Sequence, residues 1–158
     1  MKLKGREKFF WERNFNVKSV ESIPASIKGI KGIDSDHDDE FFFFLSSRVR
    51  VVEEIHLRCT NLTDVGVKHI STFSKLRDLT LKDHCRLTKS CLYDLNKLTD
   101  LEYLDISKNN FSLEDVLLLT DLKKLKTLIL SSDKPETEIA ESLVKLEAQF
   151  RGVEITVY

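Results

Sequence analysis

The chain has 158 residues, of which 41% are hydrophobic and 32% are charged, and its net charge is −1. This length corresponds to one domain, and the apolar fraction is sufficient for a core. The balanced charge argues against a general nucleic-acid binder, while the low counts of Gly (5) and Pro (2) argue against a turn-rich β-sandwich and a disordered chain.

The first residues, 1–8, contain no apolar stretch of the kind that forms a secretion signal. No window contains the roughly 18 apolar residues that a spanning helix needs. The cysteines are odd in number: Cys59, Cys85 and Cys91. We therefore expect reduced thiols in a cytoplasmic protein that does not bind membranes.

An aromatic cluster near the start of the chain consists of Phe9, Phe10, Trp11 and Phe15. Two interpretations are open: a helical cap that covers the end of the core, or a docking element for a partner. After a break at Pro24, residues 30–34 predict a degenerate first strand. We assign residues 1–50 to an N-terminal capping segment and residues 51–158 to repeats with a C-terminal cap, within a single domain.

The segment 34–40 is acidic, and it places Asp34, Asp36 and Asp38 at alternate positions, as in a calcium-binding loop. Such a loop needs Gly at its sixth position and Glu at its twelfth, where this chain has Asp39 and Leu45. We expect instead that Asp38 or Asp39 caps the start of a helix, where a negative side chain is favourable.

One spacing of apolar residues then occurs five times. The copies are Val52-x-x-Ile55-x-Leu57, Leu76-x-x-Leu79-x-Leu81, Leu101-x-x-Leu104-x-Ile106, Leu125-x-x-Leu128-x-Leu130 and Phe150-x-x-Val153-x-Ile155. Their first residues are separated by 24, 25, 24 and 25 residues. This pattern resembles a leucine-rich repeat, whose period is about 20–29 residues.

Two details strengthen the resemblance. Residues 101–111 match the repeat consensus, including Asn109 at the position that forms a hydrogen-bonded ladder, where other copies have Thr60 and His84. The segments Leu62-Thr63-Asp64 and Leu87-Thr88-Lys89 are similar to the cysteine-containing subtype of these repeats.

The resemblance implies an α/β fold: a leucine-rich-repeat solenoid with a short parallel concave sheet and helices on the convex side. The fourth and sixth residues of each copy would point into the core. Asp64 is expected to cap a helix over residues 65–73, and residues 113–122 and 137–150 are expected to form further helices.

The repeat register predicts three columns of side chains on the concave face. The first contains Glu54, Asp78, Tyr103 and Thr127; the second contains His56, Thr80, Asp105, Ile129 and Glu154; the third contains Arg58, Lys82, Ser107 and Ser131. The face would therefore have an acidic side and a basic side. Because Tyr and Arg are frequent interface hot spots, we predict that this face binds a protein. An ordinary solvated sheet face is the alternative.

Residues of metal-binding type are also present: His56 and Cys59, and the adjacent His84 and Cys85. The register directs His56 to the concave face and His84 inward, which argues against a shared zinc ion. The chain has no Gly-rich phosphate loop and no nucleophile elbow. We expect no catalytic residue, no metal and no cofactor.

The leading prediction is a non-enzymatic protein-binding module. One alternative is an assembly or adaptor factor that docks through its N-terminal aromatic segment. Another is a regulator that depends on calcium or zinc. The expected partner is another protein, and a homodimer formed through an open end of the solenoid is possible; nucleic acid and membrane are not expected partners.

Overall fold

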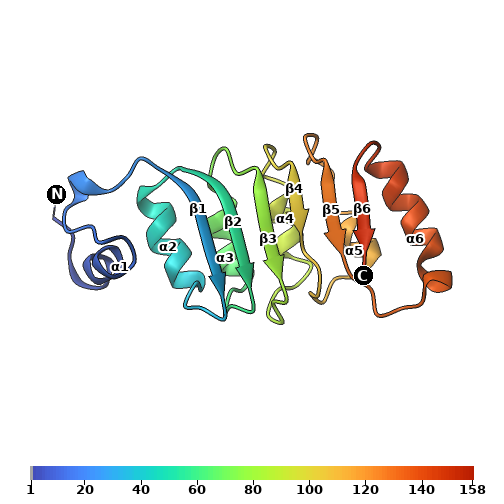
Figure 1. Ribbon diagram of the computed structural model, residues 1–158, viewed down its shortest axis with the longest axis horizontal. Helices are drawn as coiled ribbons and strands as arrows, with labels where there is room; N and C mark the ends of the chain where they lie inside the picture. Colours follow the sequence, from blue (N-terminus) through green and yellow to red (C-terminus); the bar gives the residue numbers. More distant parts are fainter. Residues whose placement is uncertain (1) are drawn as a thin grey trace.

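Six parallel strands form one sheet, in which the spatial order is the order along the chain (Figure 1). In this computed structural model, which describes residues 2–158, the strands are β1 (Ser26–Ile33), β2 (Val51–Arg58), β3 (Asp78–Lys82), β4 (Tyr103–Asp105), β5 (Thr127–Leu130) and β6 (Glu154–Val157). The predicted α/β class with a parallel sheet is confirmed.

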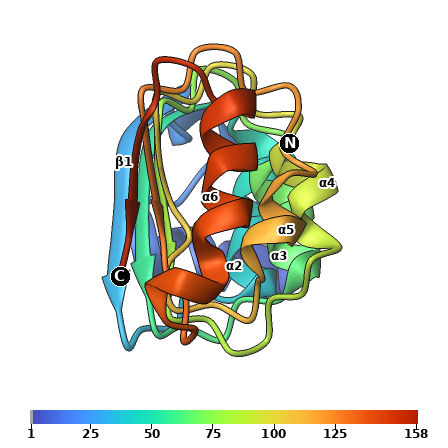
Figure 2. The same cartoon turned by 90° about the vertical axis from the view of Figure 1, so that its right-hand side faces the viewer.

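The helices that follow the strands lie together on one face of the sheet, and the other face is open (Figure 2). They are α2 (Asp39–Arg48), α3 (Asp64–Ile70), α4 (Cys91–Leu95), α5 (Leu113–Val116) and α6 (Glu136–Gln149), and they are preceded by α1 (Gly5–Phe15) and a 3₁₀ turn (Val20–Ser22). Residues 113–122, predicted to be helical, form only the four-residue α5 before turns take over. Among residues 2–158, no helix is both long and apolar enough to cross a lipid bilayer.

Neighbouring strands pair with a nearly constant offset in residue number. Ser26 lies opposite Val51, Glu54 opposite Asp78, Asp78 opposite Tyr103, Tyr103 opposite Thr127 and Thr127 opposite Glu154. The offsets are therefore 25, 24, 25, 24 and 27 residues. Side chains at the same height therefore lie on the same sheet face, and successive heights alternate between the two faces, because successive residues of a strand point to opposite sides.

The side of the sheet beneath the helices is the core. Ile55, Leu79, Leu104 and Leu128 lie in one row across adjacent strands, and each has an exposed fraction of 0%. Burying an apolar side chain of this size contributes about 1.5–3 kcal/mol. The inward direction predicted for the fourth residue of the first four copies is confirmed.

Each strand from β1 to β4 is followed closely by a residue with a left-handed backbone. These residues are Asp34, Cys59, Asp83 and Lys108, whose φ angles are 47°, 52°, 62° and 58°. The N–H of each donates to the unit that follows: Asp34 to the Arg58 carbonyl at 3.1 Å, Cys59 to the Lys82 carbonyl at 3.2 Å, and Asp83 to the Ser107 carbonyl at 3.1 Å. The chain therefore leaves the sheet by the same turn each time.

The last unit differs from the sequence prediction. The fifth copy was expected to place Val153 and Ile155 beside Leu128 and Leu130, but the pairing is Leu128 with Ile155 and Leu130 with Val157. Helix α6 has 14 residues, against five in α4 and four in α5. The longer return path shifts the strand by two residues.

The N-terminal segment packs against α2 through its rings. Trp11 is completely buried, and the Phe10 ring lies 5.2 Å from that of Phe41 and 5.4 Å from that of Phe44, centroid to centroid. Glu7 also accepts a hydrogen bond from Arg48 Nε at 2.7 Å. Helix α2 begins with Asp38, whose carboxylate accepts the Phe41 N–H at 3.0 Å, as one of the two predicted caps.

Candidate functional site

The open side of the sheet, which we call the exposed sheet face, carries columns of side chains that run across the strands. The strand pairing gives the first column as Gly29, Glu54, Asp78, Tyr103, Thr127 and Glu154. The sequence prediction put Glu154 in the second column. This was wrong, because the two-residue shift of β6 moves it opposite Thr127. Three carboxylates therefore share this column.

The second column consists of Lys31, His56, Thr80, Asp105, Ile129 and Thr156. Within it, His56 Nδ1 lies 3.1 Å from the hydroxyl of Thr80 on the next strand. This contact orients the imidazole along the sheet. His56, Thr80 and Ile129 are all partly exposed, as predicted for a surface column.

Two predicted site residues are not available on this surface. Asp105 is 6% exposed and Ser107 is 1% exposed. The Asp105 carboxylate accepts the Ser107 N–H at 2.9 Å and the Ser107 hydroxyl at 2.6 Å, so both side chains are used in closing the turn after β4. These two side chains stabilise the turn beneath the exposed sheet face and are not accessible to a partner on it.

A basic group formed by Arg58 and Lys82 lies at the carboxyl ends of β2 and β3. Arg58 is exposed and pairs across the sheet with Lys82, and Ile33 precedes them on β1 with 68% of its surface exposed. The Lys82 Nζ lies 5.9 Å from the ring centroid of Tyr158, which follows β6. Since β4 and β5 lie between these strands, the contact extends across the middle of the face.

Tyr103 lies in the first column, opposite Asp78 on β3 and Thr127 on β5. Burial raises the pKa of its phenol, and the carboxylates of Asp105 and Asp78 add to the effect because they disfavour a second negative charge nearby. The side chain is half-buried. At neutral pH it is an uncharged hydroxyl on a flat ring, which suits contact with a protein surface.

Two of the three thiols, Cys59 and Cys91, and the buried imidazole of His84 are poorly suited to nucleophilic catalysis. Burial raises the pKa of the Cys91 thiol to about 12, and the Asp83 carboxylate, which accepts a hydrogen bond from Cys59 Sγ at 3.2 Å, raises the pKa of Cys59. A nucleophilic thiol needs the opposite shift. His84 is 1% exposed, its Nε2 lies 3.0 Å from the Thr60 hydroxyl, and burial lowers its pKa.

The acidic loop is already engaged in structural contacts. Asp36 pairs with Arg13 at 2.8 Å, and Asp38 caps α2. Within residues 2–158, no three His, Cys, Asp or Glu side chains gather closely enough to hold a metal ion. His56 and Cys59 therefore gain no third ligand in the described part of the chain.

A groove between α1 and α2 was not foreseen from the sequence. It has a volume of about 640 Å³, and Phe9, Phe10, Phe41 and Phe44 are among the residues that line it. Its mouth carries the exposed ion pairs Arg6–Glu40 and Arg13–Asp36. The aromatic cluster was a signal for it, but the partners on α2 depend on how the two helices cross.

Lys31, Ile33 and Tyr158 also belong to the exposed sheet face and were missed. The sequence offered a signal for the first two, because residues 30–34 were recognised as a strand, but the register of that strand was not extended to the face.

No protein-family model matches the chain, and no curated protein sequence matches it.

Proposed function

We propose that this protein is a leucine-rich-repeat solenoid that binds another protein through its exposed sheet face and carries out no chemistry. The single observation that supports this most directly is the separation of charge on that face. Glu54 and Asp78 occupy the first column, and Arg58 and Lys82 occupy the third, on the same two strands.

The solenoid assignment is supported by the near-constant offset of 24 or 25 residues between the first five strands and by the left-handed residue that follows each strand from β1 to β4. Solenoids stack short units that cannot bury their apolar faces alone, and they present an extended sheet surface for binding. In this proposal the face is concave, and recognition depends on complementary shape and charge.

The separation of charge constrains the partner. Its surface would carry basic groups over the amino ends of β2 and β3 and acidic groups over their carboxyl ends. Tyr103 and Ile129, on the neighbouring strands β4 and β5, would supply apolar contact beside the two charged regions, because aromatic anchors dominate binding energy when their surroundings exclude water.

The proposal is tested by affinity capture from a lysate of the source organism, read by quantitative mass spectrometry. The test bait combines Arg58→Glu with Tyr103→Ala, both on the exposed sheet face. The matched control combines Arg86→Glu with Tyr93→Ala; these exposed residues lie in the loop before α4 and on α4 itself.

We expect a protein that the wild type and the control retain and the test bait loses by at least about tenfold, which corresponds to 1.4 kcal/mol. Circular dichroism would verify that all three baits are folded. Equal capture by the test bait, or loss on the control alone, would contradict the proposal.

A second function, that of an adaptor, is supported by the α1–α2 groove. The phenyl rings that line this groove, together with exposed Phe9, would bind an apolar helix of a second partner. Here Phe9→Asp would release one captured protein while leaving unchanged the protein held by the exposed sheet face. Retention of every captured protein by this variant would exclude the groove as a docking site.

A further inference from the structure

The two edges of the sheet are protected very differently. Strand β1 forms one edge and carries exposed Lys28 and Lys31, which discourage pairing with another strand. Strand β6 forms the other edge, and its sequence is Glu-Ile-Thr-Val with no lysine. Seen from that end, β6 and α6 are the nearest elements and nothing lies in front of them (Figure 2).

The backbone groups on the β6 edge are identified by the bonds on its inner side. The Glu154 N–H donates to the Lys126 carbonyl at 2.8 Å, and the Tyr158 N–H donates to the Leu130 carbonyl at 3.2 Å. Alternate residues of a strand direct their backbone groups to opposite sides. The N–H and C=O groups of Ile155 and Val157 therefore point away from β5, toward the open edge.

The same edge borders a groove of about 370 Å³ that polar and apolar side chains line in similar measure. Its lining includes Ile139 and Leu143 of α6 and the half-buried side chains of Ile155 and Val157. On the outer side of α6, Val144 is 64% exposed. The end of the molecule thus combines unpaired backbone groups with apolar side chains.

We propose that a second copy of this chain pairs with this edge, so that the two β6 strands run antiparallel about a two-fold axis through Thr156. In this register Ile155 lies opposite Val157 of the other copy, and each such pair exchanges two backbone hydrogen bonds. The four apolar side chains of the two strands then meet and close both grooves. Such an isologous interface is closed at two copies.

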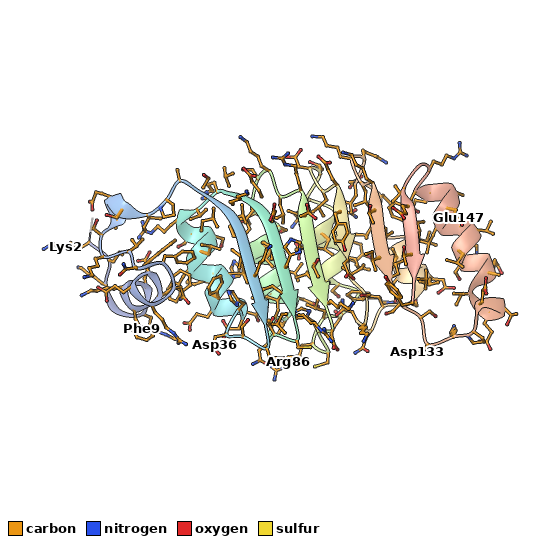
Figure 3. All side chains as sticks on the ribbon, viewed as in Figure 1. Lys2, Phe9, Asp36, Arg86, Asp133 and Glu147 are labelled. Carbon is orange, nitrogen blue, oxygen red and sulfur yellow. The ribbon has the colours of Figure 1, made fainter. Side chains whose placement is uncertain are left out.

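The same axis brings one pair of opposite charges together, beside Glu136, which also lines the groove. Lys134 and Glu147 both line the groove, and neither belongs to an ion pair within residues 2–158. Asp133, next to Lys134, lies at one end of the strand axis and Glu147 lies toward the other (Figure 3). Reversing one copy brings Lys134 to the level of Glu147 of the other copy.

The register can be tested by a cross-link. Thr156 would face its own equivalent in a pair without backbone hydrogen bonds, where the Cα atoms lie about 4.5 Å apart, within the range of a disulfide. The experiment uses Thr156→Cys in a Cys85→Ser background, because Cys85 is the exposed native thiol. Thr127→Cys, on the adjacent strand β5, is the matched control.

After mild oxidation we expect most of the Thr156→Cys chain to run as a covalent dimer on a non-reducing gel, with none for the control. In sedimentation at about 100 μM, the wild type should have the mass of a dimer, and Thr156→Lys should weaken association at least about tenfold, since like charges then face each other. A monomeric wild type, or a dimer that Thr156→Lys leaves intact, would overturn the proposal. The cross-link result decides the matter if the lysine variant does not fold.

Discussion

The carboxylate of Asp39 accepts hydrogen bonds from both the backbone N–H and the hydroxyl of Thr63, 24 residues further along the chain, at 2.8 and 2.6 Å. Asp64 does the same for Thr88, also 24 residues away, at 2.8 and 2.5 Å. A row of side-chain bonds thus connects the starts of successive helices. The sheet connects the same units on the opposite side.

Removing the Asp39 carboxylate should destabilise the fold. Its Oδ1 also accepts the Gly66 N–H at 2.9 Å, so Asp39→Ala leaves two N–H groups near the start of α3 without an acceptor. Hydrogen bonds to charged groups contribute about 1.5–3 kcal/mol each, and we expect a loss of at least about 2 kcal/mol in the free energy of unfolding. Urea denaturation measures it.

Asp36→Ala is the control for that experiment, because its ion pair with Arg13 is on the surface. We expect that variant to lose less than about 1 kcal/mol. A similar loss in both variants would show that the row of bonds between helix starts contributes little.

Asn109, which follows β4, forms a corresponding connection between units. Its Oδ1 accepts the His84 N–H at 2.8 Å, and its Nδ2 donates to the carbonyls of Leu81 and Ile106 at 2.7 and 2.9 Å. Asn109→Ala should therefore cost about 2–3 kcal/mol in urea unfolding. Asn110→Ala, which loses one exposed contact, should change the stability by less than about 0.5 kcal/mol. Equal effects would contradict this account of Asn109.

The Cys91 thiol makes stability depend on alkaline pH. Its pKa is about 12 in the folded chain and 9.0 without the fold, so the unfolded chain loses this proton first as the pH rises. The free energy of unfolding should therefore fall above pH 9, where the unfolded state binds fewer protons.

Urea denaturation at a series of pH values between pH 8 and pH 10.5 measures how the free energy of unfolding depends on pH. We expect a steeper decline in the wild type than in Cys91→Ala, in which this thiol is absent. Parallel curves would show that Cys91 ionises with an ordinary pKa in the folded protein.

The N-terminal segment is expected to act as part of the core. Because Trp11 is completely buried, Trp11→Ala should destabilise the protein by about 3–5 kcal/mol, as measured by circular dichroism in urea. Phe9→Ala is the control, since that ring is 64% exposed. If deletion of residues 1–20 left the stability of the remaining chain unchanged, the segment would be a docking element rather than a cap.

Much of the fold follows from the apolar spacing. A buried strand residue every 24 or 25 positions is enough to predict β2 to β5. It also predicts that Ile55 and Leu128 point into the core, because apolar residues on the buried face of a strand alternate with residues on its exposed face. The last helix was expected over residues 137–150, close to the observed α6, but the last strand was misplaced because the spacing does not reveal how many residues connect this helix to β6. Phe150 has the spacing expected for the first residue of the fifth copy, but it lies at the end of α6 instead.

Side-chain roles were harder to predict than positions. Asp64 was expected to cap α3, whereas the cap is Thr63, whose hydroxyl accepts the Val65 N–H at 3.2 Å. The Asp64 carboxylate instead accepts hydrogen bonds from Thr88 in the next unit. Such a contact depends on how neighbouring units stack. The burial of Asp105 and Ser107 likewise depends on the turn between them, so a register alone assigned them to the surface.

Photo-cross-linking from the exposed sheet face would establish whether a partner protein contacts this face. Benzoylphenylalanine would replace Tyr103 in one bait and Tyr93, which is on α4, in the other. We expect a specific covalent adduct in lysate from position 103 and none from position 93. An adduct from position 93 alone, or from neither position while the wild type still captures a partner, would contradict the proposal.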